Sequence, residues 1–427
     1  MWTAFESNFS EPQLFSTTAS GLGPEPVNTI QRTQAAEGAI SFDEAEFENR
    51  LQTMLGQARR PAPQSTGKVG AVEAFDWTGN QPNDFERQRR DWLTGLGSHQ
   101  PFVAGSAASN QLTGLSTAES FSTLDGYGVV NAAAAVAVAR GQTVSPVDGG
   151  YSWNNALVNA PDAWAQGITG QGTVVAVVDS GVDYTHSDLD QAIWRNRGEI
   201  AGNGIDDDGN GYVDDIRGWD FIGDDANPMD RDGHGTHVAG TVAAERNGAG
   251  ITGVAYGATV MPVRVLGNDG TGPVSTIAEG IRYAADNGAD VINLSLGSES
   301  YTSTLERAIR YATRQGAVVV SAAGNNGLDS PDYPAQFATE LGLSVGAVDR
   351  NGRVAGFSNG AGNDRSLYHV VAPGAGILST VPDEGYANFS GTSMAAPHVA
   401  GTVALMLDAN PSLTPNQVRD IVISTAA

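Results

Sequence analysis

Four polar side chains stand at places where a folded chain could bring them together for acyl transfer. Asp179 and Asn325 each follow a run of β-branched residues, whereas His234 and Ser393 each open a helix-like stretch of small residues. Catalysis by a serine requires a nucleophile, a histidine that takes its proton, a carboxylate that orients the histidine, and hydrogen-bond donors for the oxyanion. The chain offers all four groups, in the order Asp, His, Asn, Ser.

Each of these residues also has a purely structural interpretation. An Asp at the end of a strand often caps the next element, Asn325-Asn326-Gly327 is a good turn sequence, and a Ser that opens a helix is commonly a cap. His234 and His237 could instead form part of a zinc site, although no third ligand follows them at helical spacing. The combination of four groups favours acyl transfer, and a zinc hydrolase stays open as an alternative.

The elements that would position these residues alternate between strand and helix. Five apolar runs, each bounded by Gly, Asn or Asp, are Val174–Val178, Val260–Val265, Val291–Leu296, Val318–Ala323 and Leu343–Val348. Such runs, with helical stretches such as Thr276–Asn287 and Ser303–Gln315 between them, are typical of strands buried on both faces of a parallel sheet. We therefore expect residues 151–427 to form one α/β domain, a doubly wound and mostly parallel sheet with helices on both faces. Ligands bind such a sheet at the carboxyl ends of its strands, where Asp179 and Asn325 lie.

Longer motifs surround the four residues. DSGVDYTHSDL begins at Asp179, GHGTHVAG at Gly233, SAAGN at Ser321 and GTSMAAPHVAG at Gly391. In these motifs and their order the sequence resembles the subtilisin-like serine proteases, the subtilase family, over about residues 155–427. The resemblance implies a subtilisin-like fold and a serine endopeptidase that acts on protein or peptide substrates. A catalytically idle subtilase fold, used as a calcium-dependent binding module, is the alternative.

The resemblance also assigns roles at the catalytic centre. It implies that Ser393 is the nucleophile, that His234 is the general base oriented by Asp179, and that Asn325 donates to the oxyanion. Two further segments resemble those that pair with an extended substrate as an added strand. They contain Ser295, Leu296 and Gly297, and Gly270 and Gly272.

One residue bears on substrate specificity. In the family, the segment between the oxyanion Asn and a following Tyr-Pro pair forms the S1 pocket, and many relatives have a small residue directly before the Tyr. This sequence has Asp332 before Tyr333-Pro334. A carboxylate in a partly desolvated pocket favours Arg or Lys at P1, so we expect cleavage after those residues. An Asp332 that turned to solvent would serve only the turn.

An acidic insertion lengthens the spacing between the catalytic Asp and His. It covers residues 195–232, and ten Asp against two Arg fall between residues 201 and 232. The predicted ligands follow the first half of an EF-hand loop and are Asp206, Asp208, Asn210 and the carbonyl oxygen of Tyr212. An Arg stands where such a loop ends in Glu, so we expect Asp214 or Asp215 to supply the last ligand to Ca²⁺. A merely solvated acidic loop is the other interpretation.

The resemblance implies a second calcium site after the GHGTHVAG motif. The sequence there matches in length a family loop that wraps a calcium ion, and the implied ligands are Asp188, Asn247, Ala249 and Ile251. The usual N-terminal ligand has no clear match near residues 148–155. Ca²⁺ is therefore the cofactor that we expect.

The N-terminal third departs from the family pattern. Residues 1–120 are rich in Gly, Ser, Thr, Gln, Asn and Pro, and we expect a poorly ordered extension. In many subtilases a segment like Gly126–Ala133 follows the last motif helix, whereas here it precedes the domain. The run Val129–Ala139 has almost no charge, so we expect a helix within residues 121–150 to be docked on the catalytic domain. An inhibitory pro-segment is the other interpretation of the prefix.

Composition excludes several classes of protein. The 427 residues carry 48 Asp and Glu against 23 Lys and Arg, and a net charge of −25 argues against a nucleic-acid partner. The absence of Cys excludes disulfides and thiolate metal sites. No apolar stretch approaches the about 18 residues of a membrane-spanning helix, and no Sec-type signal is visible. We expect a monomer without a membrane partner, either cytoplasmic or exported by a leaderless route.

Overall fold

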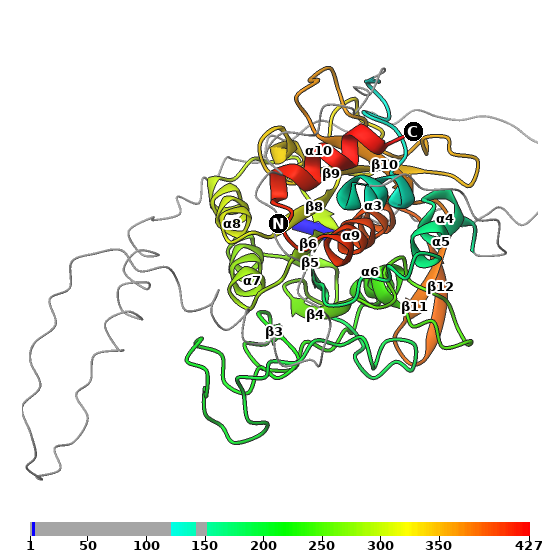
Figure 1. Cartoon of the computed structure of the whole chain (residues 1–427). Coiled ribbons are helices and arrows are strands. Elements are labelled where there is room, and N and C mark those ends of the chain that lie inside the picture. The colour runs from blue at the N-terminus through cyan, green and yellow to red at the C-terminus, as the bar shows by residue number, and fades with distance from the viewer. Residues whose placement is uncertain (1, 5–120, 142–151) are drawn as a thin grey trace, which may run out of the picture. The chain divides into compact units, whose positions relative to one another are not determined.

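The structure, a computed structural model, describes residues 2–4, 121–141 and 152–427 (Figure 1). All of these residues belong to one of the two compact units of the chain. The rest of the expected extension 1–120 lies outside the described residues, as do residues 142–151.

Seven parallel strands form the central sheet, in the order β10-β9-β8-β6-β2-β4-β3. Their bounds are β2 (Val174–Asp179), β3 (Trp219–Asp220), β4 (Thr259–Arg264), β6 (Val291–Leu294), β8 (Val318–Ala322), β9 (Leu343–Val348) and β10 (His369–Pro373). The five apolar runs of the sequence are the five inner strands, because continuous apolar strands need cover on both faces. The expected α/β sheet is confirmed, and β3, which belongs to the acidic insertion, extends one edge of it.

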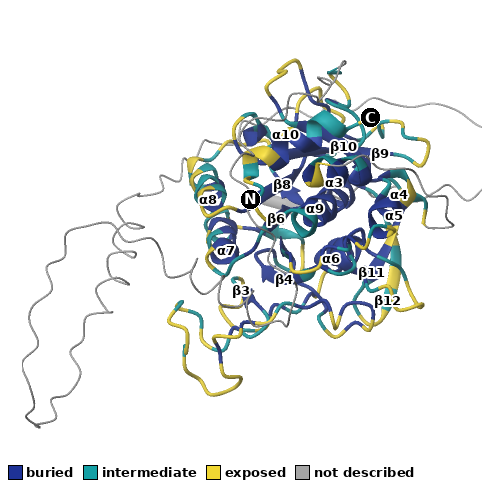
Figure 2. Cartoon of the chain, in the orientation of Figure 1, coloured by how far each residue is buried: buried dark blue, intermediate teal, exposed yellow. Residues whose placement is uncertain are grey.

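Helices cover both faces of this sheet. Their bounds are α3 (Ala132–Arg140), α4 (Trp153–Leu157), α5 (Ala160–Trp164), α6 (His234–Ala243), α7 (Val274–Asp286), α8 (Ser303–Arg314), α9 (Thr392–Ala409) and α10 (Pro415–Thr425), with a 3₁₀ turn at Ala335–Thr339. Side chains of β2 alternate between the two sides. Val175 and Val177 join one apolar core with α3, α6, α9 and α10, and Ala176 and Val178 join another with α7 and α8 (Figures 1 and 2).

The helix expected between residues 121 and 150 is α3. It begins after Asn131, whose side chain accepts a hydrogen bond of 2.9 Å from the backbone N–H of Ala134, and it ends at Gly141, which adopts a left-handed φ of 65°. Alanines and valines on most of its surface are buried, and it packs against α5, α9 and α10.

The residues before α3 run along the edge of the sheet. Val129 bridges to Val371 of β10, and Val130 donates its backbone N–H to the carbonyl oxygen of Val371 at 2.9 Å. Val129 also exchanges two backbone hydrogen bonds with Ala427, of 2.9 and 3.0 Å. This segment and the stretch after α10 therefore lie side by side.

Two smaller sheets flank the central one. Strands β5 (Thr271–Gly272), β1 (Trp2–Ala4) and β7 (Leu296–Gly297) form the first, and β11 (Ile377–Val381) and β12 (Gly385–Phe389) form an antiparallel hairpin. Within the described part of the chain, no helix has both the length and the apolar character needed to cross a bilayer.

Candidate active site

A buried carboxylate holds a buried imidazole at the carboxyl end of β2. Asp179 is the last residue of β2 and His234 is the first residue of α6. Nδ1 of His234 lies 2.8 Å from Oδ1 of Asp179, and both side chains are almost completely buried. A carboxylate can only accept, so Nδ1 carries the proton and Nε2 is the basic nitrogen of the neutral ring.

A second buried carboxylate, which the sequence did not single out, organises the same corner. Asp230 accepts hydrogen bonds from the hydroxyl of Ser180 at 2.9 Å and from the hydroxyl of Thr236 at 2.6 Å. It also accepts from backbone N–H groups at the start of α6. Ser180 in turn accepts from the backbone N–H of Gly235 at 3.0 Å and donates its own N–H to Asp179 at 2.7 Å. Asp230 thereby ties the strand end that carries the carboxylate to the helix that carries the imidazole.

Ser393 lies in the first turn of α9 and is completely buried. Its Oγ donates to the carbonyl oxygen of Ser295 at 3.1 Å, and its own carbonyl oxygen accepts from the hydroxyl of Ser295 at 2.8 Å. The side-chain amide of Asn293 donates to the same Ser295 hydroxyl at 2.9 Å. These contacts fix the position of the Ser393 backbone relative to the segment expected to bind substrate.

Asn325 has the orientation that an oxyanion donor needs. Its Oδ1 accepts two hydrogen bonds of 2.9 Å, from the backbone N–H and from the hydroxyl of Thr392, the residue before Ser393. Its Nδ2 is therefore turned away from Thr392, and this buried donor has no partner among the described residues. Buried amides are normally paired, so an unpaired one next to a candidate nucleophile is suited to a charge that develops only during reaction.

The segments expected to bind a substrate strand are present at the same place. Leu296 and Gly297 form β7, Gly272 belongs to β5, and Gly270 lies in the turn before it with a left-handed φ of 69°. Ser295 connects β7 to Ser393 through the two hydrogen bonds described above.

Asp332 is buried, with only 3% of its surface exposed, and does not turn to solvent. The next residue, Tyr333, exchanges two backbone hydrogen bonds of 2.9 Å with Ser298, which continues the β7 segment. Burial and, to a smaller extent, the nearby charge of Glu299 raise the pKa of Asp332 to about 6 against the opposing effect of a hydrogen bond from Asn359. One carboxylate oxygen, Oδ2, is buried and has no hydrogen-bond partner among the described residues.

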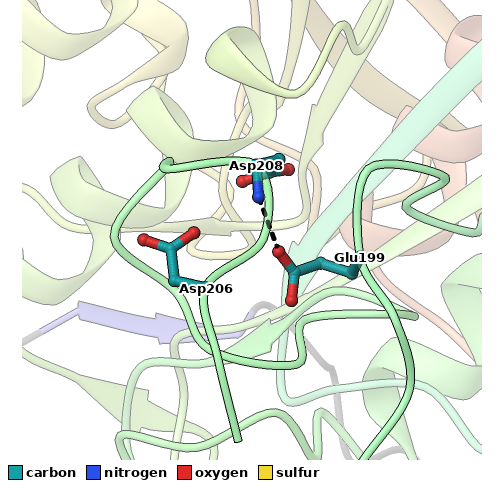
Figure 3. Close-up of side chains that lie close together, drawn as sticks. All are labelled: Glu199, Asp206 and Asp208. Carbon is teal, nitrogen blue, oxygen red and sulfur yellow. Dashed lines mark hydrogen bonds between the residues drawn. The ribbon is translucent and has the colours of Figure 1, made fainter. Parts of the chain in front are cut away.

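The acidic insertion brings together a set of carboxylates that differs from the expected one. Oxygens of Glu199, Asp206 and Asp208 lie within 4.8 Å of one another (Figure 3). Asp214 instead accepts backbone N–H groups of residues 202–204, and Asp215 accepts from the hydroxyl of Tyr283 at 2.6 Å. Glu199, which precedes the EF-hand-like stretch, is the third carboxylate of this cluster.

The remaining predicted ligands of this loop have definite partners. Asn210 donates its side-chain amide to Asp215 at 3.0 Å and accepts the backbone N–H of Tyr212 at 2.8 Å. Burial raises the pKa of Asp215, and hydrogen bonds from Tyr283 and two asparagines oppose the shift. Three clustered carboxylates fit a hard divalent cation such as Ca²⁺, whose ligands are oxygens.

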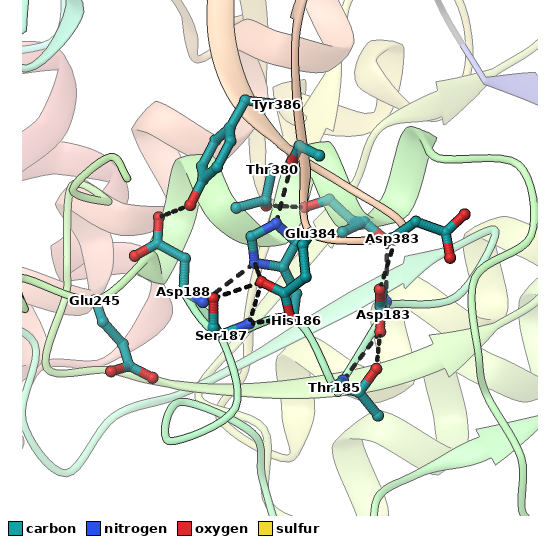
Figure 4. A network of polar contacts seen from close by, with 12 residues as sticks. Asp183, Thr185, His186, Ser187, Asp188, Glu245, Thr380, Asp383, Glu384 and Tyr386 are labelled. Atoms are coloured by element: carbon teal, nitrogen blue, oxygen red, sulfur yellow. Dashed lines mark hydrogen bonds and ion pairs between the residues drawn. The ribbon is translucent and has the colours of Figure 1, made fainter. Parts of the chain in front are cut away.

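The second predicted calcium position centres on Asp188, shown in Figure 4. Its Oδ2 accepts from the backbone N–H of Ile251 at 2.9 Å and from the hydroxyl of Tyr386 at 3.2 Å. Its buried Oδ1 has no partner among the described residues, and a carboxylate oxygen in this situation could serve as a ligand to a hard cation. The Oδ1 of Asn247, by contrast, accepts the backbone N–H of Ala249 at 2.9 Å and caps its own turn.

His237 has a different environment from His234. Its ring stacks on Phe389 with centroids 4.4 Å apart, and its Nε2 lies 2.9 Å from the carbonyl oxygen of Ile377. Burial lowers its pKa to about 3. The only cluster of candidate metal ligands among the described residues is that of Glu199, so the geometry favours a packing role for His237 over a zinc site.

Comparisons with known proteins agree with this geometry. Residues 170–427 match the model described as Subtilase family. The chain is 44% identical to subtilisin BL of Lederbergia lenta over 275 residues, which cover 64% of this chain and 90% of that protein. It is also 44% identical over 278 residues to a thermophilic serine proteinase of Bacillus sp. (strain AK1), and these residues cover 65% of this chain and 62% of that protein. The crystal structure of a cold adapted subtilisin-like serine proteinase superposes with a TM-score of 0.50 at 30% identity, covering 67% of this chain and 89% of that one.

Proposed function

We propose, from the premise that the chain belongs to the subtilase family and is a subtilisin-like serine endopeptidase, that Ser393, His234 and Asp179 are its catalytic triad. The observation that carries this assignment is the buried 2.8 Å contact between Nδ1 of His234 and Asp179. This contact leaves Nε2 of His234 as the base for the hydroxyl of Ser393, which lies in the first turn of α9.

The reaction then proceeds in two similar halves. The Oγ of Ser393 bonds to the scissile carbonyl carbon while its proton passes to Nε2 of His234. The carbonyl oxygen becomes an oxyanion, which accepts hydrogen bonds from Nδ2 of Asn325 and from the backbone N–H of Ser393. When the C–N bond breaks, the leaving amine takes the proton from His234. Water then attacks the acyl-enzyme by the same proton transfers and releases Ser393.

The substrate is a protein or peptide with Arg or Lys at P1. Asp332 supports this preference because it is buried beside the segment that continues β7 and keeps one oxygen unpaired among the described residues. An Arg side chain would pair with both oxygens, whereas an apolar side chain would leave the carboxylate without a partner.

Calcium would be held by Glu199, Asp206 and Asp208 in the insertion, and by Asp188 at the second position. At the first place the ion would neutralise three clustered carboxylates, and at the second it would bind the buried oxygen of Asp188 that has no partner among the described residues. Its contribution is to stability, and the residues of the triad carry the chemistry.

A serine-reactive phosphonate probe, applied with and without EGTA, tests the assignment. We expect one label, on Ser393, and loss of labelling in Ser393→Ala with an unchanged circular dichroism spectrum. Labelling that falls when EGTA removes calcium supports the metal sites as well. A folded, calcium-loaded protein that takes no label would instead be a catalytically idle binding module, and peptidase activity that survives Ser393→Ala would indicate a metallohydrolase.

A further inference from the structure

A buried ion pair joins the acidic insertion to the strand that leads into a substrate-binding segment. Asp220 belongs to β3, the strand that the insertion adds to the sheet, and Arg264 is the last residue of β4. The two strands are neighbours at one edge of the sheet (Figure 1), and their register pairs Asp220 with Arg264. Nη1 of Arg264 donates to Oδ2 of Asp220, and only 6% of the Arg264 surface and 3% of the Asp220 surface are exposed. Because a buried charge is costly without a partner, the pair holds both side chains in place.

The other arm of the same guanidinium reaches the turn before β5. Nη2 of Arg264 donates to the side-chain oxygen of Asn268 at 2.7 Å. Residues 267–271 form a turn that is closed by a hydrogen bond of 2.8 Å, from the backbone N–H of Gly267 to the carbonyl oxygen of Thr271, the first residue of β5. The rigid, planar fork of the guanidinium therefore connects the insertion to the turn that leads into β5.

The backbone between Arg264 and β5 contacts two parts of the site. Gly272 of β5 lies so close to this backbone that a Cβ on it would come within 2.3 Å of the carbonyl oxygen of Val265. Val265 and Leu266 donate their backbone N–H groups to the carbonyl oxygen of Asp179 at 2.8 and 3.1 Å. A displacement of this segment would thus affect the position of β5 and also that of the catalytic carboxylate.

Aromatic side chains attach β3 to the acidic loop. The ring of Tyr212 packs edge to face on the rings of Trp219 and Phe221, with centroids 5.0 and 5.5 Å apart. Phe221 also donates its backbone N–H to the carbonyl oxygen of Arg264 at 2.8 Å. The acidic loop, β3 and the end of β4 therefore pack as one unit.

We propose that Arg264 is a positioning residue for the substrate: anchored by Asp220 of the insertion, it holds Asn268 and thereby sets the position of β5 against an extended peptide. This inference rests on the proposed function of the site. Pairing with an added strand depends on the alignment of backbone donors and acceptors, so a displaced β5 weakens the binding of a peptide that pairs with it. A substrate too short to pair is unaffected. The insertion thereby contributes to the selection of long substrates over short ones.

Two substrates with the same P1 residue and the same thiobenzyl ester leaving group test the proposal. One is a blocked single residue, which offers no strand to pair, and the other is a blocked tetrapeptide. The measurement is the ratio of kcat/KM for the long substrate to that for the short one, because effects on the triad act on both and cancel. Asn268→Ala should lower this ratio by about three- to tenfold, the size expected for the loss of one hydrogen bond. Asn268→Asp keeps an acceptor for Arg264 and should retain the parental ratio.

A second pair of variants tests the link to the insertion. Asp220→Asn removes the charge that anchors Arg264 and should lower the ratio as Asn268→Ala does. Asp224→Asn removes the same charge from an exposed residue of the same insertion and should leave the ratio unchanged. If the unpaired guanidinium unfolds the Asp220→Asn protein, the double variant Asp220→Asn, Arg264→Met contains no unpaired charge and should show the same low ratio.

A parental ratio in folded Asn268→Ala, or in a folded protein without the pair of Asp220 and Arg264, would overturn the proposal. An equal loss for both substrates would also overturn it, because the variants would then act through Asp179 and not through β5. Failure of the proposed function gives a different result, since the parent would then hydrolyse neither substrate and take no phosphonate label on Ser393.

Discussion

Replacing Asp332 by Asn tests the proposed S1 pocket most directly, because the substitution keeps the shape of the side chain and removes its charge. Burial raises the pKa of Asp332 to about 6, so its ionised fraction in the free enzyme is about 99% at pH 8 and about 10% at pH 5. A hydrogen bond to a charged group contributes about 1.5–3 kcal/mol, which corresponds to about 10- to 150-fold in specificity. Asp332→Asn should therefore lower the preference for Arg over Phe at pH 8 by about that factor.

The assay is kcat/KM for two peptides that differ only at P1, measured from pH 5 to pH 8. This parameter reports ionisations of the free enzyme, and the protonation of His234 scales both substrates equally. The ratio of the Arg value to the Phe value thus isolates Asp332. In the parent enzyme it should fall about tenfold as the pH drops through 6, and in Asp332→Asn it should be flat.

A parent ratio that favours Phe at pH 8, or a ratio that does not change with pH, would refute an acidic S1 pocket.

The stability of the Asp332→Asn variant provides the control. Since burial raises the pKa of Asp332, folding penalises its ionised form, and this penalty is absent below about pH 4 and fully present above about pH 6. Asp332→Asn should therefore melt no lower than the parent at pH 8, and any change in specificity cannot come from unfolding.

The other parts of the site give sharp expectations as well. Asn325→Ala should lower kcat by about 10²–10³, the range known for such a donor in subtilisin, with little change in KM; equal losses in binding would contradict an oxyanion role. Calcium at a hundredfold excess over its Kd should stabilise the parent by about 2.7 kcal/mol, and Glu199→Gln should reduce this gain. Melting curves recorded with calcium and with EGTA measure it, and an unchanged response in Glu199→Gln would place the metal elsewhere. Asp230→Asn should lower kcat by about tenfold or more and spare KM, and a change in KM alone would speak against a positioning role. Deleting residues 1–120 should leave the melting temperature nearly unchanged, whereas deleting 1–145 should lower it clearly; similar melting of both would rule out a structural role for α3.

The inner strands and the main helices could be predicted from sequence because their signals are local. Five runs of β-branched residues became the five inner strands, and their continuous apolar character indicated cover on both faces. Elements of two or three residues could not be found in this way. Strands β1, β3, β5 and β7 are too short to show a period, and they exist because neighbouring backbone groups pair with them.

The same limit applies to single residues of the site. Asp179 and His234 stand in long motifs, whereas Asp230 and Glu199 act through spatial neighbours that the sequence does not reveal. Asp230 receives hydrogen bonds from Ser180, which lies 50 positions earlier. An EF-hand register predicts Asp214 or Asp215 as the last ligand and cannot point to Glu199, which lies outside that register but joins Asp206 and Asp208 in the cluster.

The segment that contains α3 illustrates how little the fold depends on the position of an element in the sequence. Its buried alanines and valines pack on α9 and α10. The backbone of Val129 pairs with β10 and with Ala427. None of these contacts requires α3 to follow α10 along the chain, because packing and strand pairing act between surfaces. A helix with so little charge must find an apolar surface wherever it occurs in the sequence, and the edge beside β10 offers one. The departure from the family order is therefore compatible with the same catalytic domain.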